Sequence, residues 1–157
     1  MLLHGSLMHV SDPLSSGRFV RFLAEEAPAA HYFLAQPPEG IIMTAAVGWK
    51  VIVPDLPTIA PLAGALWDGY HSLVKPLHGD SIGRLPQVHV KIRNMKGLYD
   101  QFVLGQDFKD REGFCHRLKE TAAILHSKDH QAEMHEELER TAASEYWTRV
   151  CRKGGRS

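Results

Sequence analysis

The chain contains 157 residues, of which 44% are hydrophobic and 23% charged, values close to those of average globular domains. This length and composition predict one domain with a buried core. The 18 basic and 18 acidic residues cancel, so the chain has little long-range attraction for nucleic acid or anionic lipid, and association with other chains is favoured. Two cysteines, Cys115 and Cys151, are too few for a disulfide framework and favour an intracellular, reducing compartment. Residues 1–18 lack the basic segment and the long apolar run of a secretory signal.

Three local patterns predict regular structure near the N-terminus. Residues 2–10 and 31–35 are rich in apolar and aromatic side chains and predict two strands. Residues 15–26 predict a short helix between them, because apolar side chains recur there at helical spacing. The side chains that this helix would bury are Phe19, Val20, Phe22 and Leu23.

The most apolar stretch, residues 40–67, contains only two charged side chains, Lys50 and Asp55. A membrane-spanning helix needs about 20 apolar residues in one run, and here the two charges and three prolines interrupt the run. The alternation around Val51 predicts a strand, and the apolar spacing after Pro57 predicts a helix capped by a polar side chain. A soluble strand-turn-helix unit is therefore expected in place of a membrane span, and peripheral membrane association stays open.

The clearest strand signal lies at residues 86–94, with the sequence PQVHVKIRN. Apolar and polar side chains alternate there with a period of two, which is typical of a strand with one buried and one solvated face. The inward set is Val88, Val90 and Ile92, and the outward set is His89, Lys91 and Arg93.

From residue 95 onward the sequence becomes more charged and predicts helices. Apolar residues at 95–103 form a first helical stripe, and Asp107 is a candidate cap for a second helix. Ser127 or Asp129 would cap a third helix reaching about Arg152, unless residues 107–152 form one continuous helix. The fold predicted from these patterns is α+β: a small, mostly antiparallel sheet with packed helices in residues 1–94, followed by a helical C-terminal arm, a hairpin or one long helix, in residues 95–157.

The end of this arm is the leading candidate for a binding surface. Acidic residues precede basic residues along it, which suits the helix dipole, and a narrow apolar stripe follows the same helix. Exposed aromatic and arginine side chains are typical of protein interfaces. The predicted partner-binding residues are Tyr146, Trp147, Arg149, Val150, Arg152 and Lys153.

A second candidate surface is a basic stripe around the strand at 86–94, in a region without acids between Asp80 and Asp100. Basic side chains on an open strand face, close to Tyr99 and Phe102, are suited to single-stranded RNA. The residues of this stripe are Arg84, Lys91, Arg93 and Lys96.

Two further patterns suggest chemistry. His126, His130 and Glu133 would share one face of a continuous helix, as a metal site requires, although a solvated polar face explains the same spacing and no metal is predicted. The run Leu3-His4-Gly5-Ser6 on a first strand resembles the nicotinamide-binding element of ADP-ribosyltransferases. That resemblance implies a small enzyme that uses His4.

Taken together, these patterns predict a non-catalytic accessory or architectural subunit of a larger assembly, binding other protein subunits through its C-terminal helices. Two alternatives stay open. One is an RNA-binding component of a ribonucleoprotein, and the other is a small enzyme, metal-dependent or ADP-ribosyltransferase-like. No residue is predicted to be catalytic and no cofactor is predicted.

Overall fold

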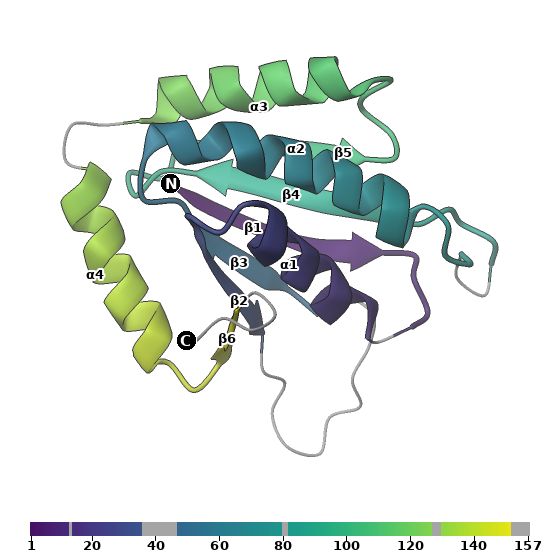
Figure 1. The fold of residues 1–157 in the computed structure, drawn as a ribbon, viewed down its shortest axis with the longest axis horizontal. Coiled ribbons are helices and arrows are strands. Elements are labelled where there is room, and N and C mark those ends of the chain that lie inside the picture. Colours follow the sequence, from purple (N-terminus) through teal and green to yellow (C-terminus); the bar gives the residue numbers. More distant parts are fainter. Residues whose placement is uncertain (13, 36–46, 80–81, 127–129, 152–157) are drawn as a thin grey trace.

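Within the described residues, six strands form one antiparallel sheet in the order β5-β4-β1-β3-β2-β6 (Figure 1). The computed structural model describes residues 1–12, 14–35, 47–79, 82–126 and 130–151, except the side chain of His130. The elements are β1 (Leu2–Met8), α1 (Ser15–Glu26), β2 (His31–Ala35), β3 (Trp49–Ile52), η1 (Leu56–Thr58), α2 (Ile59–Gly69), η2 (Tyr70–Val74), β4 (Gln87–Arg93), β5 (Tyr99–Leu104), α3 (Arg111–Leu125), α4 (His130–Ala143) and β6 (Trp147–Val150). The predicted α+β fold is confirmed.

The first four strands and two helices follow the β-α-β-β-α-β connectivity of ferredoxin-like domains. β1 lies at the centre, because it pairs with β3 on one side and with β4 on the other. β5 then extends the sheet beyond β4, and β6 extends it beyond β2. Both outer strands follow residue 94, so one sheet contains strands from both parts of the predicted division. The division of the chain into two domains at that residue stays a prediction.

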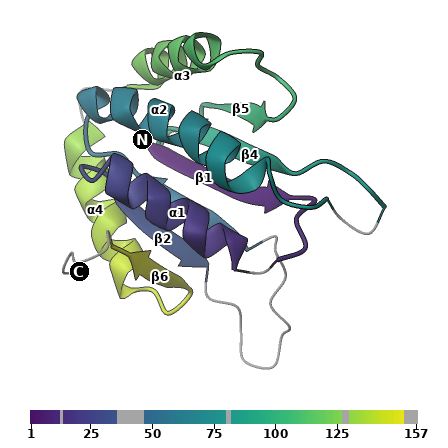
Figure 2. The same cartoon turned by 45° about the vertical axis from the view of Figure 1, so that its right-hand side comes forward.

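One face of the sheet carries the main core. Alternate residues of β1, β3 and β4, such as Leu3, Val51 and Val90, point to this face and are buried there. α1, α2 and α3 cover them in a single layer, with α2 between the other two (Figures 1 and 2). Most of the buried apolar side chains lie between this helical layer and the sheet, so the main core occupies one face of the sheet.

The other face of the sheet is covered only in part, by α4. A small cluster of Leu2, Phe33, Ile52 and Met134 lies between this helix and strands β1, β2 and β3. Helices therefore lie on both faces of the sheet. The half of this second face formed by β4 and β5 has no described helix over it.

The N-terminal predictions agree with the structure. The strands around residues 2–8, 31–35 and 87–93 and the helix at 15–26 form as predicted. Residues 49–69 form the strand-turn-helix unit, in which the Asp55 carboxylate accepts a hydrogen bond of 3.1 Å from the Thr58 backbone N–H. No helix in the described part of the chain is both long enough and apolar enough to cross a bilayer.

The helix predicted at residues 95–103 is wrong, because this segment turns and continues as β5. The Asn94 side chain accepts hydrogen bonds from the backbone of Lys96 (3.0 Å) and Leu98 (3.1 Å), and Gly97 adopts a φ of 89°. Glycine reaches this left-handed conformation without steric cost. The turn places Phe102 and Leu104 on the core face, where they are buried.

The start of the next helix also differs from the prediction. α3 is capped by Asp110, whose carboxylate accepts a 2.7 Å hydrogen bond from the Gly113 backbone, and not by Asp107. The backbone of His126 then leaves the helix with a ψ of 136°, so residues 107–152 do not form one continuous helix. The predicted caps of the following helix, Ser127 and Asp129, lie outside the described residues.

The predicted extension of the last helix to Arg152 is wrong as well. α4 ends at Ala143, and residues 147–150 form β6 against β2. Aromatic and β-branched side chains at these positions favour a strand, and pairing with β2 provides backbone hydrogen bonds. Trp147 packs on the α4 side of the sheet and Val150 on the other, as the two-residue period of a strand requires.

A close contact at the centre of the sheet makes a first testable prediction. A methyl group on Gly5 would overlap the Trp49 ring and the backbone oxygen of His89. We expect Gly5→Ala to lower the free energy of unfolding by about 3 kcal/mol, because both neighbours lie within the packed sheet. Urea denaturation followed by circular dichroism would measure the change.

Gly17→Ala is the matched control on α1, where the added methyl would meet only Leu34 at 3.7 Å. It should leave stability unchanged or raise it by about 0.5 kcal/mol, because alanine favours the helix. Equal effects of the two substitutions would contradict the packing role of Gly5.

Candidate functional site

The open half of the second sheet face contains a hollow of about 390 Å³. Its floor is formed by neighbouring positions of β1, β4 and β5, because His4 pairs with Lys91, Ser6 with His89, and Lys91 with Gln101. Even-numbered residues of β1 point away from the core, which brings His4 and the basic strand to one surface. The sequence had suggested these two features separately. The polar side chains that line the hollow are His4, Ser6, His89, Lys91 and Gln101.

His4 has an unusual environment at the edge of this hollow. Its Nε2 atom is buried and has no hydrogen-bond partner among the described residues. Burial, followed by the positive charges of Arg93 and Lys50, lowers the pKa of His4 to about 4. The imidazole is therefore neutral at pH 7, and its unpaired Nε2 atom is enclosed by the protein.

A buried ion pair lies next to His4 and holds α4 on the sheet. Lys50 Nζ lies 2.5 Å from Glu137 Oε1 and 2.8 Å from the hydroxyl of Thr141. The other oxygen of Glu137 accepts a 2.8 Å hydrogen bond from Arg140. Burial raises the pKa of Glu137, but the hydrogen bonds from Lys50 and Arg140 outweigh it and the net shift is downward. Because both carboxylate oxygens are occupied, this group anchors the helix and is not available to a substrate.

The predicted basic stripe is divided by the fold. Lys91 and Arg93 lie on the open face of β4, where the Lys91 ammonium is 4.2 Å from the centroid of the Tyr99 ring. Arg84 precedes the strand in an irregular segment, and Lys96 belongs to the turn that follows it. The strand itself therefore carries two of the four predicted cations, and the segments on either side of it carry the other two.

Of the predicted partner-binding residues, Trp147, Arg149 and Val150 lie on the edge strand β6 and Tyr146 lies in the turn before it, so these four are not on a helix. Tyr146 is 53% exposed and packs edge-on against Trp147, with ring centroids 5.1 Å apart. Arg149 donates a 2.8 Å hydrogen bond to Nδ1 of His31 and lies 5.5 Å from the Phe33 ring. Val150 packs against the main core. Arg152 and Lys153 lie outside the described residues.

The apolar stripe predicted on the last helix is used within the chain. Met134 is buried against the sheet and Leu138 is partly buried beside it. The buried Glu137 and Thr141 continue this packed side of α4. What remains exposed at the C-terminal end is the region of Tyr146 and β6.

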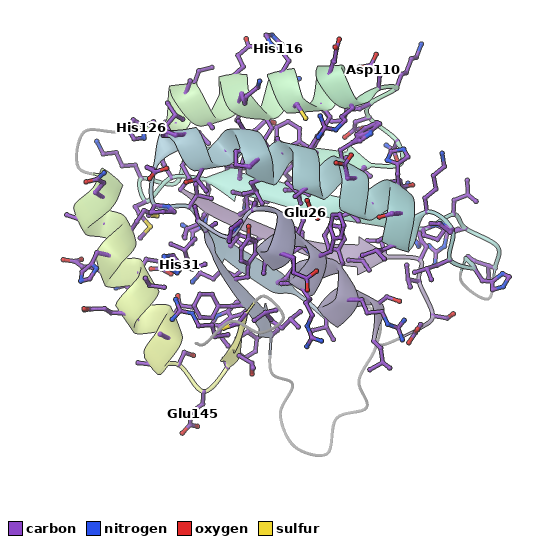
Figure 3. The ribbon with its side chains drawn as sticks, in the orientation of Figure 1. Glu26, His31, Asp110, His116, His126 and Glu145 are labelled. Atoms are coloured by element: carbon purple, nitrogen blue, oxygen red, sulfur yellow. The ribbon has the colours of Figure 1, made fainter. Side chains whose placement is uncertain are left out.

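The predicted histidine cluster is not built on one helix. His126 is the C-cap of α3, as Figure 3 shows, whereas Glu133 lies in the first turn of α4. The side chain of His130 lies outside the described residues. Across the part of the chain that the structure describes, no group of three His, Cys, Asp or Glu side chains is arranged to hold a metal ion. The helical spacing failed as a guide because the helix ends at His126.

The His-Gly-Ser element has a structural explanation in the packing of Gly5 against Trp49 and His89. Among the described residues that line the hollow there is no carboxylate, so no acid–base pair is assembled with His4 there. The arrangement offers neutral hydrogen-bonding groups and one ammonium, which suits binding.

Comparison with protein-family models, curated proteins and solved structures finds no match to this chain. The two features that bear on function are the open sheet face and the β6 edge.

Two parts of this site were missed by sequence reasoning. Lys50 lies inside an apolar strand pattern, which indicates a buried positive charge that needs an acidic partner. That partner, Glu137, lies 87 residues away, so the sequence did not identify it. Gln101 was missed because the segment around it was predicted to be helical. In both cases the missing information was long-range strand and helix placement.

The ion pair gives a second prediction. We expect Glu137→Ala to lower the free energy of unfolding by about 3 kcal/mol, because it leaves the Lys50 ammonium buried without a counter-charge. Adding Lys50→Met should recover part of this loss, since the unpaired charge is removed. Urea denaturation of the two single variants and the double variant would measure the coupling.

The exposed Glu139, on the same helix, provides the control. Glu139→Ala should change stability by less than about 0.5 kcal/mol. Strictly additive effects of the Lys50 and Glu137 substitutions would contradict the proposed anchor.

His4 gives a third prediction, on pH dependence. The pKa of His4 is near 4 in the folded chain against an ordinary 6.5, so the unfolded chain binds the proton first as the pH falls. Stability should therefore decrease between pH 7 and pH 4.5. The ideal loss is about 2.5 kcal/mol, and partial exposure of the ring reduces it to about 1.5 kcal/mol.

Thermal denaturation across this range would compare the wild-type chain with His4→Gln, which should lose stability less steeply. His116→Gln is the control, because His116 is 80% exposed. A pH profile unchanged by His4→Gln would show that the ring is protonated equally in both states.

Proposed function

We propose that this protein is a non-catalytic subunit that binds a partner protein at the outer edge of β6. The observation that supports this most directly is an edge strand that carries Trp147 and Arg149, with Tyr146 in the turn directly before it. No other described strand pairs with the outer edge of β6. The proposed occupant is an extended, acidic segment of the partner, added to the sheet as a further strand.

The pairing of β2 determines to which side each backbone N–H and C=O group of β6 points. The N–H of Ala35 donates to the Gly48 oxygen, at 2.8 Å, toward β3. Along a strand, the backbone groups of successive residues point alternately to the two sides. Those of Ala35 point to β3, so those of Leu34 point to β6, where they face its register partner Thr148. The backbone N–H and C=O of Arg149 are then directed to the open edge, as a template for another strand.

The side chains around this edge support an acidic partner. Arg149 is exposed on β6. In the amino-acid sequence, residues 140–156 carry five basic residues against one acid, Glu145. The half-exposed Tyr146 lies beside the same edge. Aromatic and arginine residues contribute most to binding energy at protein interfaces, and basic surroundings favour an acidic chain.

The proposed compartment is intracellular and reducing. Both cysteines are free, with Cys115 on α3 and Cys151 directly after β6. A free thiol beside the proposed binding edge is suited to an environment where thiols stay reduced.

A fourth prediction tests the edge directly. Arg149→Pro removes an N–H that points outward and should leave the β2–β6 ladder largely intact, while Thr148→Pro removes one that points to β2. We expect Arg149→Pro and Tyr146→Ala each to weaken partner binding about 30-fold, equivalent to about 2 kcal/mol. Quantitative co-purification from native cells, followed by titration with the purified partner, would measure this.

Lys75→Gln, on an exposed side chain far along the chain from β6, is the charge control and should bind normally. Thr148→Pro should instead lower the melting temperature, because it disrupts the sheet. Undiminished partner binding by a folded Arg149→Pro, Tyr146→Ala double variant would refute the β6 interface.

A further inference from the structure

We propose that the open half of the second sheet face is a binding site for single-stranded nucleic acid, with one base in the hollow beside His4. This site is separate from β6 and does not depend on the proposed protein interface. It joins three kinds of group on adjacent strands: neutral polar side chains, two cations and one exposed aromatic ring.

The hollow supplies the base-binding part. Its volume of about 390 Å³ is within the range of small-ligand sites. The hydroxyl of Ser6 and the amide of Gln101, both in the lining of the hollow, offer donors and acceptors of the kind that recognise base edges.

The cations supply the backbone-binding part. Lys91 and Arg93 point to the same face of β4, about 7 Å apart along the strand. The adjacent Asp100 does not neutralise them, because its carboxylate accepts a 3.0 Å hydrogen bond from Arg117 of α3 on the other side of the sheet. A chain of phosphates following β4 would therefore meet two cations in succession.

The aromatic ring supplies a stacking surface. Tyr99 is 57% exposed, opposite Arg93 in the β4–β5 register. The Lys91 ammonium covers one face of this ring, 4.2 Å from its centroid, so a base would stack on the opposite face with a cation close by. A free anion needs only the cations, whereas stacking and base-edge groups beside them favour a nucleic acid strand. Because the chain has no net charge, the binding depends on this local surface.

Fluorescence anisotropy with the full chain provides the test, using labelled 12-nucleotide RNA and DNA of one mixed sequence at 50 and 200 mM salt. We expect the wild-type chain to bind at 50 mM salt and more weakly at 200 mM. Lys91→Gln and Tyr99→Leu should each reduce the affinity about tenfold, through a lost phosphate contact and a lost stacking contact respectively. Lys75→Gln removes the same charge from another surface and should change it less than twofold.

Tighter binding of RNA would assign a contact to the 2′-hydroxyl, and equal binding would assign the site to bases and phosphates; both outcomes support the proposal. The proposal is overturned if the wild-type chain binds neither strand at 50 mM salt, or if Lys91→Gln behaves like Lys75→Gln. It is also overturned if Tyr99→Leu has no effect, because the surface would then be a simple anion site. Since β6 is unchanged in all these variants, failure here leaves the protein interface intact.

Discussion

The ion pair between Lys50 and Glu137 determines how the second face of the sheet is used. It joins the centre of the sheet to α4, which otherwise rests on a small apolar cluster. Burying two charges is costly unless each finds good partners, and here Thr141 and Arg140 complete the set. The position of α4 is therefore specified by these polar contacts together with the small apolar cluster beneath it.

This anchor divides the second face into a covered half and an open half. The covered half reaches β6 through Trp147, whose ring lies 5.6 Å from the Lys50 ammonium. The open half begins at His4, where the positive charges of Lys50 and Arg93 help keep the imidazole neutral. A single buried pair thus sets the environment of both candidate surfaces, and this explains why they lie on either side of α4.

Local patterns in the sequence predicted the elements of the first four strands well, because each is a clear two-residue alternation or a compact apolar run. They failed at β5 and β6, where short aromatic and β-branched segments fit a helical period and a strand period equally. Pairing with β4 and β2 decided the outcome, and pairing is not encoded locally. The same limit applied to the site, since His4 and Lys91 become neighbours only through the β1–β4 register.

The strand order places the two proposed surfaces at opposite ends of the sheet, β6 at one edge and the β4–β5 half at the other. Between the β6 edge and the hollow lie β2 and β3, with α4 over part of their outer face, so a ligand on one surface does not block the other. A neutral chain gains little from long-range attraction, and its binding must come from local groups of this kind. Two separated local surfaces on one rigid sheet are the arrangement that an adaptor needs to hold a protein segment and a nucleic acid strand at the same time. The accessory-subunit and nucleic-acid hypotheses are therefore compatible, because the two proposed surfaces lie on different strands.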